Sequence, residues 1–315
     1  MRFNVDFAPH RHLGSLLRWI RGTDTALIGR MLTLLVVALF LGAVLVRPSY
    51  GRWEVVELAA PTTQTGGATR PETSEPPPTP TPVPIPDEVK VPILMYHYVS
   101  ELPPDADVYR RDLTVSPEAF DAQLQYLAEA GYHPITLTDV YLALTEGYPL
   151  PEKPVVLTFD DGYRDAYEVV FPRLLDYGFP ATFFVLATPA HYGSEEYMTW
   201  EHVREMSEAG MSIQAHGRDH VDLRGRPYEF LVHQILGITE PIEYHTGRAP
   251  RFFCYPSGYR DADVIAVLKS ADYLGSVTTE WGRTHTRQNL FEMPRLRIRG
   301  GDSLAVFVAK LEGEP

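Results

Sequence analysis

Cysteine is almost absent from this 315-residue chain, and lysine is missing from its first 47 residues. The single cysteine, Cys254, excludes an internal disulfide framework and a zinc site built from four thiolates. Residues 1–47 carry six arginines and two aspartates, which gives this segment a net charge of +4. The whole chain has a net charge of −13, so the rest carries −17. A body this acidic repels phosphates, which excludes nucleic acid as a partner.

Long apolar runs are rare as well, and the one that stands out is residues 31–46, which contain no charge. Extended back to Ala26, the run has 21 residues and a helical length of about 31 Å, enough to cross a bilayer. Arginines are concentrated before it, which predicts a cytoplasmic N-terminus (1–25), a single-pass anchor in the cell membrane (26–46) and an extracellular remainder. A cleaved signal peptide is the alternative, but the leader is long and no small-residue cleavage pattern closes the run.

Proline and threonine dominate the next segment. Residues 61–86 hold nine prolines and seven threonines. Such a run favours extended polyproline II at ~3.1 Å per residue, so the stalk could reach about 80 Å. We therefore predict a disordered linker at 47–88 and one folded domain at 89–315.

Short apolar runs alternate with helical patterns from residue 89 onward. This alternation is typical of a parallel sheet covered by helices, open or closed into a barrel, and seven or eight strands in about 225 residues favour a barrel. The predicted strands are Val91–Tyr96, Pro134–Leu137, Val155–Phe159, Ala181–Leu186, Met211–Ala215, Phe252–Tyr255, Tyr273–Val277 and Arg295–Ile298. The predicted helices are a segment from Ser116 to Gly131, Asp139–Glu146, Ala166–Tyr177 with a kink at Pro172, and Glu201–Ala209.

Polar pairs follow two of these strands. Asp160 and Asp161 come directly after Val155–Phe159, although Asp-Asp-Gly alone also makes a good turn. His216 and His220 follow another strand, and two histidines four residues apart at a strand end can turn toward one metal ion. Because parallel barrels gather reactive groups at the C-terminal ends of their strands, we expect the two pairs to lie together.

Two other strand ends carry candidate functional residues. His97 follows the first strand; in isolation it is equally a core or capping histidine. Phe252–Tyr255 runs into Pro256-Ser257-Gly258, a tight loop whose backbone N–H groups could face a ligand, or an ordinary turn.

Four motifs together resemble a known family. Thr158-Phe159-Asp160-Asp161-Gly162, the His216-x-x-x-His220 pair and Tyr255-Pro256-Ser257-Gly258 resemble the polysaccharide deacetylase family (NodB-homology domain, carbohydrate esterase family four) and occur in its order. Pro92-Ile93-Leu94-Met95-Tyr96-His97 resembles the branch with an early catalytic histidine, which includes poly-N-acetylglucosamine deacetylases. The resemblance covers roughly residues 89–300 and implies an α/β fold, a distorted (β/α) barrel of about seven parallel strands.

The resemblance also implies a metal centre. Asp161, His216 and His220 match the family's metal-binding triad, and the ion is most often Zn²⁺. Two imidazoles and one carboxylate leave a coordination position open for water, whose pKa the ion lowers toward ~7.

Three further roles follow from the same resemblance. Asp160 matches the general base that takes the proton of the attacking water, and His97 matches the general acid that protonates the leaving amine. The backbone N–H of Ser257 is expected to help hold the tetrahedral oxyanion.

The sequence departs from the family pattern at two positions. Gly217 stands where the family usually has Ser or Thr, which predicts a looser histidine loop. Cys254 stands where the family often has an arginine that orients the base. We expect Cys254 to be buried and inert, and Arg295, in preference to Arg297, to supply the missing charge. We expect Trp281 to be a core residue.

These observations predict a membrane-tethered, extracellular N-deacetylase of an N-acetylated polysaccharide, with no protein partner indicated. An O-acetyl polysaccharide esterase would use the same groups, and a non-catalytic glycan-binding surface protein would be expected to lack some of them. A glycosidase is a poorer fit, because adjacent strand residues point to opposite faces, whereas a retaining carboxylate pair sits ~5 Å apart across a sugar.

Overall fold

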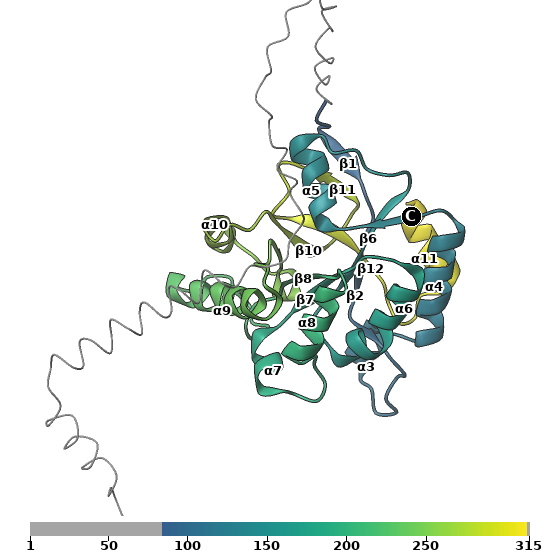
Figure 1. Cartoon of the computed structure of the whole chain (residues 1–315), viewed down its shortest axis with the longest axis horizontal. Coiled ribbons are helices and arrows are strands. Elements are labelled where there is room, and N and C mark those ends of the chain that lie inside the picture. Colours follow the sequence, from purple (N-terminus) through teal and green to yellow (C-terminus); the bar gives the residue numbers. More distant parts are fainter. Residues whose placement is uncertain (1–83, 314–315) are drawn as a thin grey trace, which may run out of the picture. The chain divides into compact units, whose positions relative to one another are not determined.

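The computed structural model describes residues 84–313 of the chain (Figure 1). The predicted cytoplasmic segment (1–25), the predicted anchor (26–46) and all but the last five residues of the predicted linker (47–88) lie outside this range. Among the helices of residues 84–313, none is both long and apolar enough to cross a bilayer.

Each of the eight predicted strands is present, and together they form one sheet. Its strands occur in the order β2-β12-β10-β9-β8-β7-β6-β5, and all of its pairings are parallel. The strands are β2 (Ile93–Tyr96), β5 (His133–Ile135), β6 (Pro154–Phe159), β7 (Thr182–Val185), β8 (Ser212–Ala215), β9 (Phe252–Cys254), β10 (Gly275–Trp281) and β12 (Met293–Arg297). Four shorter strands form two separate pairs: β1 (Glu88–Lys90) with β11 (Thr284–Thr286), and β3 (Tyr98–Val99) with β4 (Thr114–Val115).

An additional pairing closes the sheet into a barrel. β2 pairs with β6 from Ile93 opposite Val156 to Tyr96 opposite Phe159. β5 pairs only with the first half of β6, so it stands outside the ring and seven strands close it. The predicted barrel of about seven parallel strands is therefore confirmed.

Alternation along the strands sorts side chains into two buried layers. On β6, Leu157 and Phe159 pack in a large cluster with the surrounding helices. Val156 packs in a second cluster with Phe184 of β7 and Phe252 of β9, inside the ring. Because Thr158 and Asp160 share the parity of Val156, they also face the barrel interior. The barrel interior is thus apolar around Val156, in the first half of β6, and polar at the C-terminal ends of the strands.

Helices surround the barrel, as Figure 1 shows. The predicted start of α4 is confirmed: the Ser116 side chain accepts a hydrogen bond from the N–H of Ala119, and Pro117 occupies the first helical position. The helices are α3 (Val108–Leu113), α4 (Pro117–Glu129), α5 (Leu137–Glu146), α6 (Phe171–Tyr177), α7 (Ala187–Tyr192), α8 (Trp200–Glu208), α9 (Tyr228–Thr246), α10 (Ala262–Ser270) and α11 (Leu304–Glu312).

The predicted irregularity at Pro172 takes the form of a π-helical turn. The segment η1 (Ala166–Val170) is π-helical and continues into α6. Proline has no N–H to donate into an α-helical ladder. The preceding turn widens, and Phe171 N–H donates to the carbonyl of Ala166, five residues back. This turn follows the two adjacent aspartates closely, and such π-turns are frequent near functional sites.

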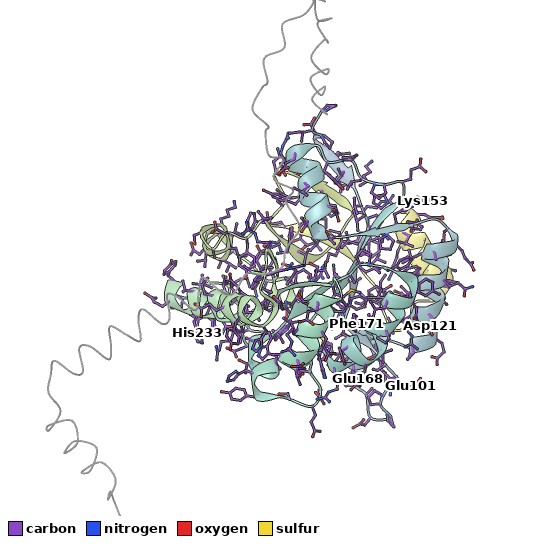
Figure 2. The ribbon with its side chains drawn as sticks, viewed as in Figure 1. Glu101, Asp121, Lys153, Glu168, Phe171 and His233 are labelled. Atoms are coloured by element: carbon purple, nitrogen blue, oxygen red, sulfur yellow. The ribbon has the colours of Figure 1, made fainter. Side chains whose placement is uncertain are left out.

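The surface carries exposed charged side chains and one unexpected tryptophan. Asp121 on α4, Glu168 on η1 and His233 on α9 are exposed (Figure 2). Trp281, predicted to be a core residue, is 62% exposed at the end of β10, so that prediction was wrong. The first four residues of β10 are buried and the last three are exposed, which the composition of the segment does not reveal.

A buried histidine makes folding stability depend on pH. His285 is fully buried, its Nε2–H donates to the carbonyl of Val91, and burial lowers its pKa to about 4. The unfolded chain therefore binds one more proton than the folded chain between pH 6.5 and about 4. This contribution is complete above pH 6.5 and is lost as the pH falls toward 4. We expect His285 alone to reduce the free energy of unfolding by ~2 kcal/mol between pH 7 and pH 5.

Urea unfolding at pH 7 and pH 5 measures this effect. His285→Gln should flatten the pH dependence, whereas the control His133→Gln, at an exposed histidine, should leave it unchanged. Equal pH dependence in the parental chain and in His285→Gln would contradict the assignment.

Candidate active site and metal centre

Two aspartates follow β6 without a break. Asp160 continues the strand, and its N–H donates to the carbonyl of Tyr96 on β2 at 3.0 Å. Asp161 adopts the left-handed conformation, with φ of 72°, and turns the chain out of the strand. Each carboxylate is buried and lies within 4.8 Å of a ring nitrogen of His216. The turn at Asp161 therefore lets two adjacent carboxylates face one centre, although a continuous strand would point them to opposite faces.

The two histidines of the predicted triad meet Asp161 at this centre. His216, directly after β8, places Nε2 3.0 Å from Asp161 Oδ1, and His220 Nε2 lies 3.3 Å from the same oxygen. His220 also has a left-handed backbone, with φ of 51°. Non-glycine residues in this region are uncommon and cluster at functional sites. The structure brings together the three residues of the predicted metal triad.

A hydrogen bond on the side of the ring away from Asp161 fixes the orientation of His216. Its Nδ1 lies 2.7 Å from the backbone carbonyl of Cys254 on β9. A carbonyl oxygen only accepts, so Nδ1 carries a hydrogen and donates it. In the neutral ring, Nε2 then presents a lone pair toward Asp161, the arrangement that a metal-ligating histidine needs.

The atoms facing one another at the centre fit a divalent cation. Asp161 Oδ1 is buried, and no donor within residues 84–313 forms a well-aligned hydrogen bond with it. An oxygen and two ring nitrogens gathered this closely need a positive charge between them. A proton on His216 supplies that charge when no ion is bound, and a bound metal ion would take its place. Two imidazole nitrogens and one carboxylate oxygen are donors that suit zinc and similar metals.

The pKa values of the pair agree with this picture. Burial raises the pKa of Asp161, but the facing His216 lowers it more, so the pKa lies well below its usual value. Burial lowers the pKa of His216, but Cys254 and Asp161 raise it more, so it lies well above its usual value. The carboxylate is therefore ionised, as a metal ligand must be.

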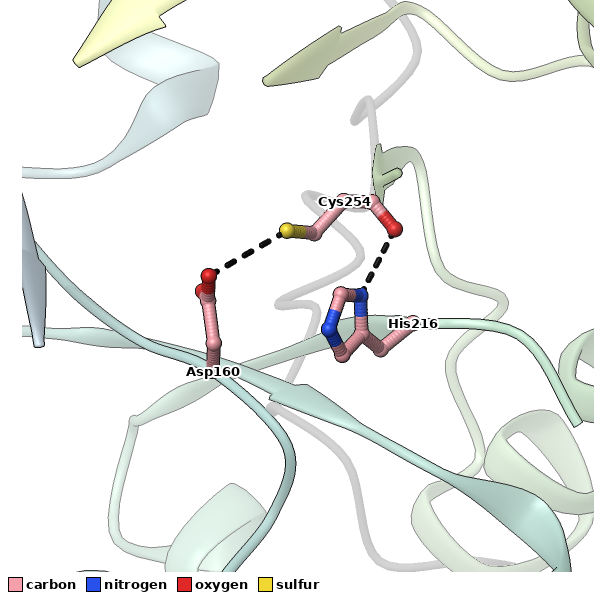
Figure 3. A group of neighbouring side chains, drawn as sticks. All are labelled: Asp160, His216 and Cys254. Carbon is pink, nitrogen blue, oxygen red and sulfur yellow. Dashed lines mark hydrogen bonds between the residues drawn. The ribbon is translucent and has the colours of Figure 1, made fainter. Parts of the chain in front are cut away.

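Asp160, His216 and Cys254 form a second group of facing donor atoms (Figure 3). The Cys254 thiol donates to Asp160 Oδ2 at 3.4 Å, and burial raises the pKa of this thiol. The guanidinium of Arg295 contacts the same two side chains, with Nη2 3.2 Å from Cys254 Sγ. A cation already fills this space, so the geometry favours the Asp161 group as the metal site.

Arg295 holds Asp160 in place through a two-pronged ion pair. Nη1 donates to Oδ1 at 2.8 Å and Nη2 to Oδ2 at 2.7 Å. The guanidinium is fully buried, and it also donates to Thr158 Oγ1 and to the carbonyl of Thr278. Burial raises the pKa of Asp160, but Arg295 lowers it more, so Asp160 is ionised. Arg295 thus contacts the predicted base, whereas Arg297 pairs with Asp112.

His97 approaches the same carboxylate from β2. Its Nε2 lies 4.0 Å from Asp160 Oδ2, and its Nδ1 is buried without a hydrogen-bond partner among the described residues. Burial lowers the pKa of His97, and the charges of Asp160 and Asp161 only partly offset this. A lowered pKa makes the protonated ring a stronger acid but reduces the fraction protonated at neutral pH.

Ser257 lies on a short 3₁₀ turn, η2 (Pro256–Gly258), which follows β9. Ser257 is exposed and has a left-handed backbone, with φ of 56°. A Cβ at Gly258 would come 2.2 Å from Thr279 Oγ1, so this turn requires glycine. The turn begins two residues after Cys254, whose thiol and carbonyl contact the centre. The role of Ser257 as an oxyanion donor stays a prediction.

A cavity of about 470 Å³ lies among the segments that follow two of the site motifs. Its lining includes Tyr98, which follows His97, and Tyr163, which follows Gly162; their rings stack at 3.6 Å. Sequence analysis did not identify this cavity. The only hint in the sequence was that each tyrosine directly follows a site motif, Tyr98 after His97 and Tyr163 after Gly162.

Comparison with known proteins identifies the family. The sequence model of the polysaccharide deacetylase family matches residues 147–275. The polysaccharide deacetylase-family protein YxkH of Bacillus subtilis strain 168 is 30% identical over 223 residues, which cover 71% of this chain and 76% of that protein. The chain belongs to the polysaccharide deacetylase family. It is therefore a member of an enzyme family, as the four motifs predicted.

One further protein and two solved structures are also similar to the chain. A poly-β-1,6-N-acetyl-D-glucosamine N-deacetylase of Escherichia coli K12 is 29% identical over 243 residues, covering 64% of this chain but only 36% of that protein. The structure of the Streptococcus pyogenes deacetylase PplD in complex with acetate has 29% identity and a TM-score of 0.65, over 71% of this chain and 98% of that one. IcaB from Ammonifex degensii has 26% identity and a TM-score of 0.61, over 71% and 97%.

Proposed function

We propose that the chain is a metal-dependent hydrolase that removes N-acetyl groups from an extracellular polysaccharide and releases acetate. The observation that carries this proposal is the convergence of Asp161, His216 and His220 beside a second carboxylate, Asp160, which Arg295 holds separately. The similar Escherichia coli protein acts, by its name, on poly-β-1,6-N-acetyl-D-glucosamine, so this polymer is the first substrate to test.

Asp161, His216 and His220 would hold the ion, for which we propose Zn²⁺. A bound divalent ion supplies Lewis acidity: it lowers the pKa of water from 15.7 toward ~7 and polarises a carbonyl oxygen. Asp161 brings the negative charge, and the two rings bring neutral nitrogen donors. The Cys254 carbonyl keeps the His216 lone pair aimed at the site.

Asp160 is the proposed general base, because it is ionised and faces the centre without belonging to the triad. The ion pair with Arg295 fixes the plane of its carboxylate, so the oxygen that accepts the proton of the attacking water has a defined position. The same ion pair lowers the pKa of Asp160, which keeps it in the proton-accepting form over a wide pH range.

His97 is the proposed general acid, and the N–H of Ser257 is the proposed oxyanion donor. His97 Nε2 lies 4.0 Å from Asp160 Oδ2. The proposed base, which takes up one proton, and the proposed acid, which delivers another, are therefore neighbours. The cavity lined by Tyr98 and Tyr163 has the volume to take a sugar of the polymer, and we propose it as a subsite.

The proposal is tested by two assays on one set of glycans. Poly-β-1,6-N-acetylglucosamine, chitin oligomers, peptidoglycan and acetylated xylan are incubated with the zinc-loaded chain, and released acetate and new free amine are both measured. An N-deacetylase releases them in equal amounts. Release of acetate without new amine would instead show an O-acetyl esterase. If no glycan gives any product, the non-catalytic glycan-binding alternative is the one that remains.

Replacing His97 tests the assignment of the acid. His97→Ala should retain its metal and lose ~10²–10⁴ in amide turnover, since an amine leaves poorly until it is protonated. An activated acetate ester needs this proton less and should lose less. Parental rates on N-acetylglucosamine oligomers would show that His97 is structural.

We further propose that residues 26–46 tether the protein to the cell membrane, with residues 89–315 on the extracellular side. The arginine-rich flank before the apolar run supports this orientation. Deleting residues 1–47 should release an active protein into the soluble fraction. A truncated protein that still sediments with membranes in high salt would contradict a single anchor.

A further inference from the structure

His220 is held less directly than the other members of the proposed metal triad. The His216 ring is anchored by the Cys254 carbonyl. Apart from its approach to Asp161, the His220 ring makes no hydrogen bond to another residue of the described chain, and its side chain is 37% exposed. The position of His220 therefore depends on the backbone of the loop that carries it, residues 216–220, which we call the histidine loop.

One buried side chain of α9 holds this loop. Gln234 is 2% exposed, and its Oε1 accepts hydrogen bonds from the N–H groups of Arg218, at 3.2 Å, and Asp219, at 3.1 Å. Its Nε2 donates to Asp219 Oδ2 at 2.7 Å. The other oxygen of Asp219 accepts from the hydroxyl of Thr188. Gln234 thus contacts the loop at three points, directly before His220.

Glycine at position 217 fits this arrangement. Gly217 has φ of 87°, a conformation that favours glycine, and a Cβ there would lie 3.9 Å from Gln234 Oε1. One turn further along α9, Gly237 leaves room for Arg218, whose Cδ would lie 3.4 Å from an added Cβ. The sequence predicted a looser loop because Gly217 lacks a hydroxyl. The structure shows contacts that this expectation did not include, and they come from α9, the next helix along the chain, 16 and 15 residues after Arg218 and Asp219.

We infer that Gln234 is a positioning residue that sets the affinity of the metal centre by fixing the backbone on which His220 stands. The inference rests on the proposed function, since it assumes that His220 is a ligand. Without Gln234, the partly buried N–H groups of Arg218 and Asp219 lose their acceptor and Asp219 Oδ2 loses its donor, so nothing from α9 then fixes the loop backbone. Side chains that hold a ligand from outside the ligand set typically contribute 10–100-fold to metal affinity.

The test measures the dissociation constant for Zn²⁺ by chelator competition on the full chain in detergent, without any substrate. Gln234→Met, which keeps the volume and removes all three hydrogen bonds, should weaken zinc binding 10–100-fold. The matched control is Gln214→Met. Gln214 is also buried, and its Oε1 also accepts from two successive N–H groups, those of Arg251 and Phe252, at 2.8 Å each. The control should lower thermal stability and leave the zinc constant within about threefold.

A second pair of variants keeps the test decisive if Gln234→Met does not fold. Gln234→Glu retains an acceptor for both N–H groups but sets a carboxylate against Asp219, so zinc binding should weaken. In the double variant with Asp219→Asn, the amide of residue 219 donates to the carboxylate of residue 234, which reverses the parental hydrogen bond. The zinc dissociation constant should then return to within about threefold of the parental value. A residue that served only the fold would give no such rescue in zinc affinity.

The outcomes distinguish a failure of the positioning role of Gln234 from a failure of the proposed metal site. A zinc constant unchanged in Gln234→Met or in Gln234→Glu overturns the positioning role, provided that His220→Ala weakens binding. Equal zinc binding by the parental chain and His220→Ala removes the proposed metal site itself, and with it this inference.

Discussion

His216→Ala is expected to lose nearly all bound zinc and all measurable deacetylation. His216 supplies a ring nitrogen 3.0 Å from Asp161 Oδ1, and its other nitrogen is already committed to the Cys254 carbonyl. Among residues 84–313, the guanidinium of Arg295 already occupies the space beside Cys254, so no second donor stands ready to replace His216. His220→Ala should have the same effect. Metal content by elemental analysis and acetate release measure both losses together.

A histidine outside the centre provides the control. His233 is exposed on α9, so His233→Ala should keep its metal and its rate (Figure 2). Parental zinc content in His216→Ala would show that the ion binds elsewhere.

Asp160→Asn distinguishes base from ligand. It should retain zinc and lose turnover, since Asp160 stands outside the triad. The amide also removes the charge that Arg295 faces, so some loss of folding stability is expected, and zinc is best measured on the folded fraction. Zinc loss equal to that of His216→Ala would overturn this division of roles.

Arg295→Met is expected to lower both the free energy of unfolding and turnover. Arg295 is fully buried and donates to Asp160, Thr158 and the Thr278 carbonyl. Removing one partner of a buried ion pair leaves the other charged and unpaired, which typically costs ~3–5 kcal/mol. Domain stability is ~5–15 kcal/mol in total, so this is a large fraction of it. Turnover should fall as well, because nothing then fixes the Asp160 carboxylate.

Arg297→Met is the matched control. It lies on the same strand and pairs with Asp112, but both side chains are about 30% exposed, and such pairs contribute ~0–1 kcal/mol. Urea unfolding of the two variants should therefore differ by several kcal/mol. Similar unfolding midpoints for Arg295→Met and the parental chain would show that the buried pair contributes nothing net.

The strands and the strand-end motifs were predictable because local patterns specify them. Val155–Phe159 is apolar on both faces, as a strand buried between helices and a barrel interior must be. The meeting of Asp161 with His216 followed from the rule that parallel strands end at one edge. Within this scheme, Arg295 was preferred over Arg297, and the structure places Arg295 on Asp160.

The contacts that sequence missed are those between residues far apart in the chain. No neighbour in sequence offers Cys254 a base, yet its side chain contacts Asp160 and Arg295 across the barrel interior. Gln234, only 15 residues beyond Asp219, was overlooked for another reason: α9 follows Pro227 without a side-chain cap and contains Pro241, so the usual helix signals are weak there. Single-sequence patterns report neighbours along an element and say little about which element lies opposite.

The closure of the barrel has a consequence during synthesis. β12 inserts between β2 and β10, and its Arg295 lies 135 residues beyond the Asp160 that it neutralises. A nascent chain that has not yet released this strand from the ribosome has two open strand edges, at β2 and β10, and a carboxylate without its counter-ion. Contacts of such high contact order form slowly, and unpaired edges invite aggregation. We therefore expect the growing polypeptide to be most prone to aggregation until β12 has left the ribosome.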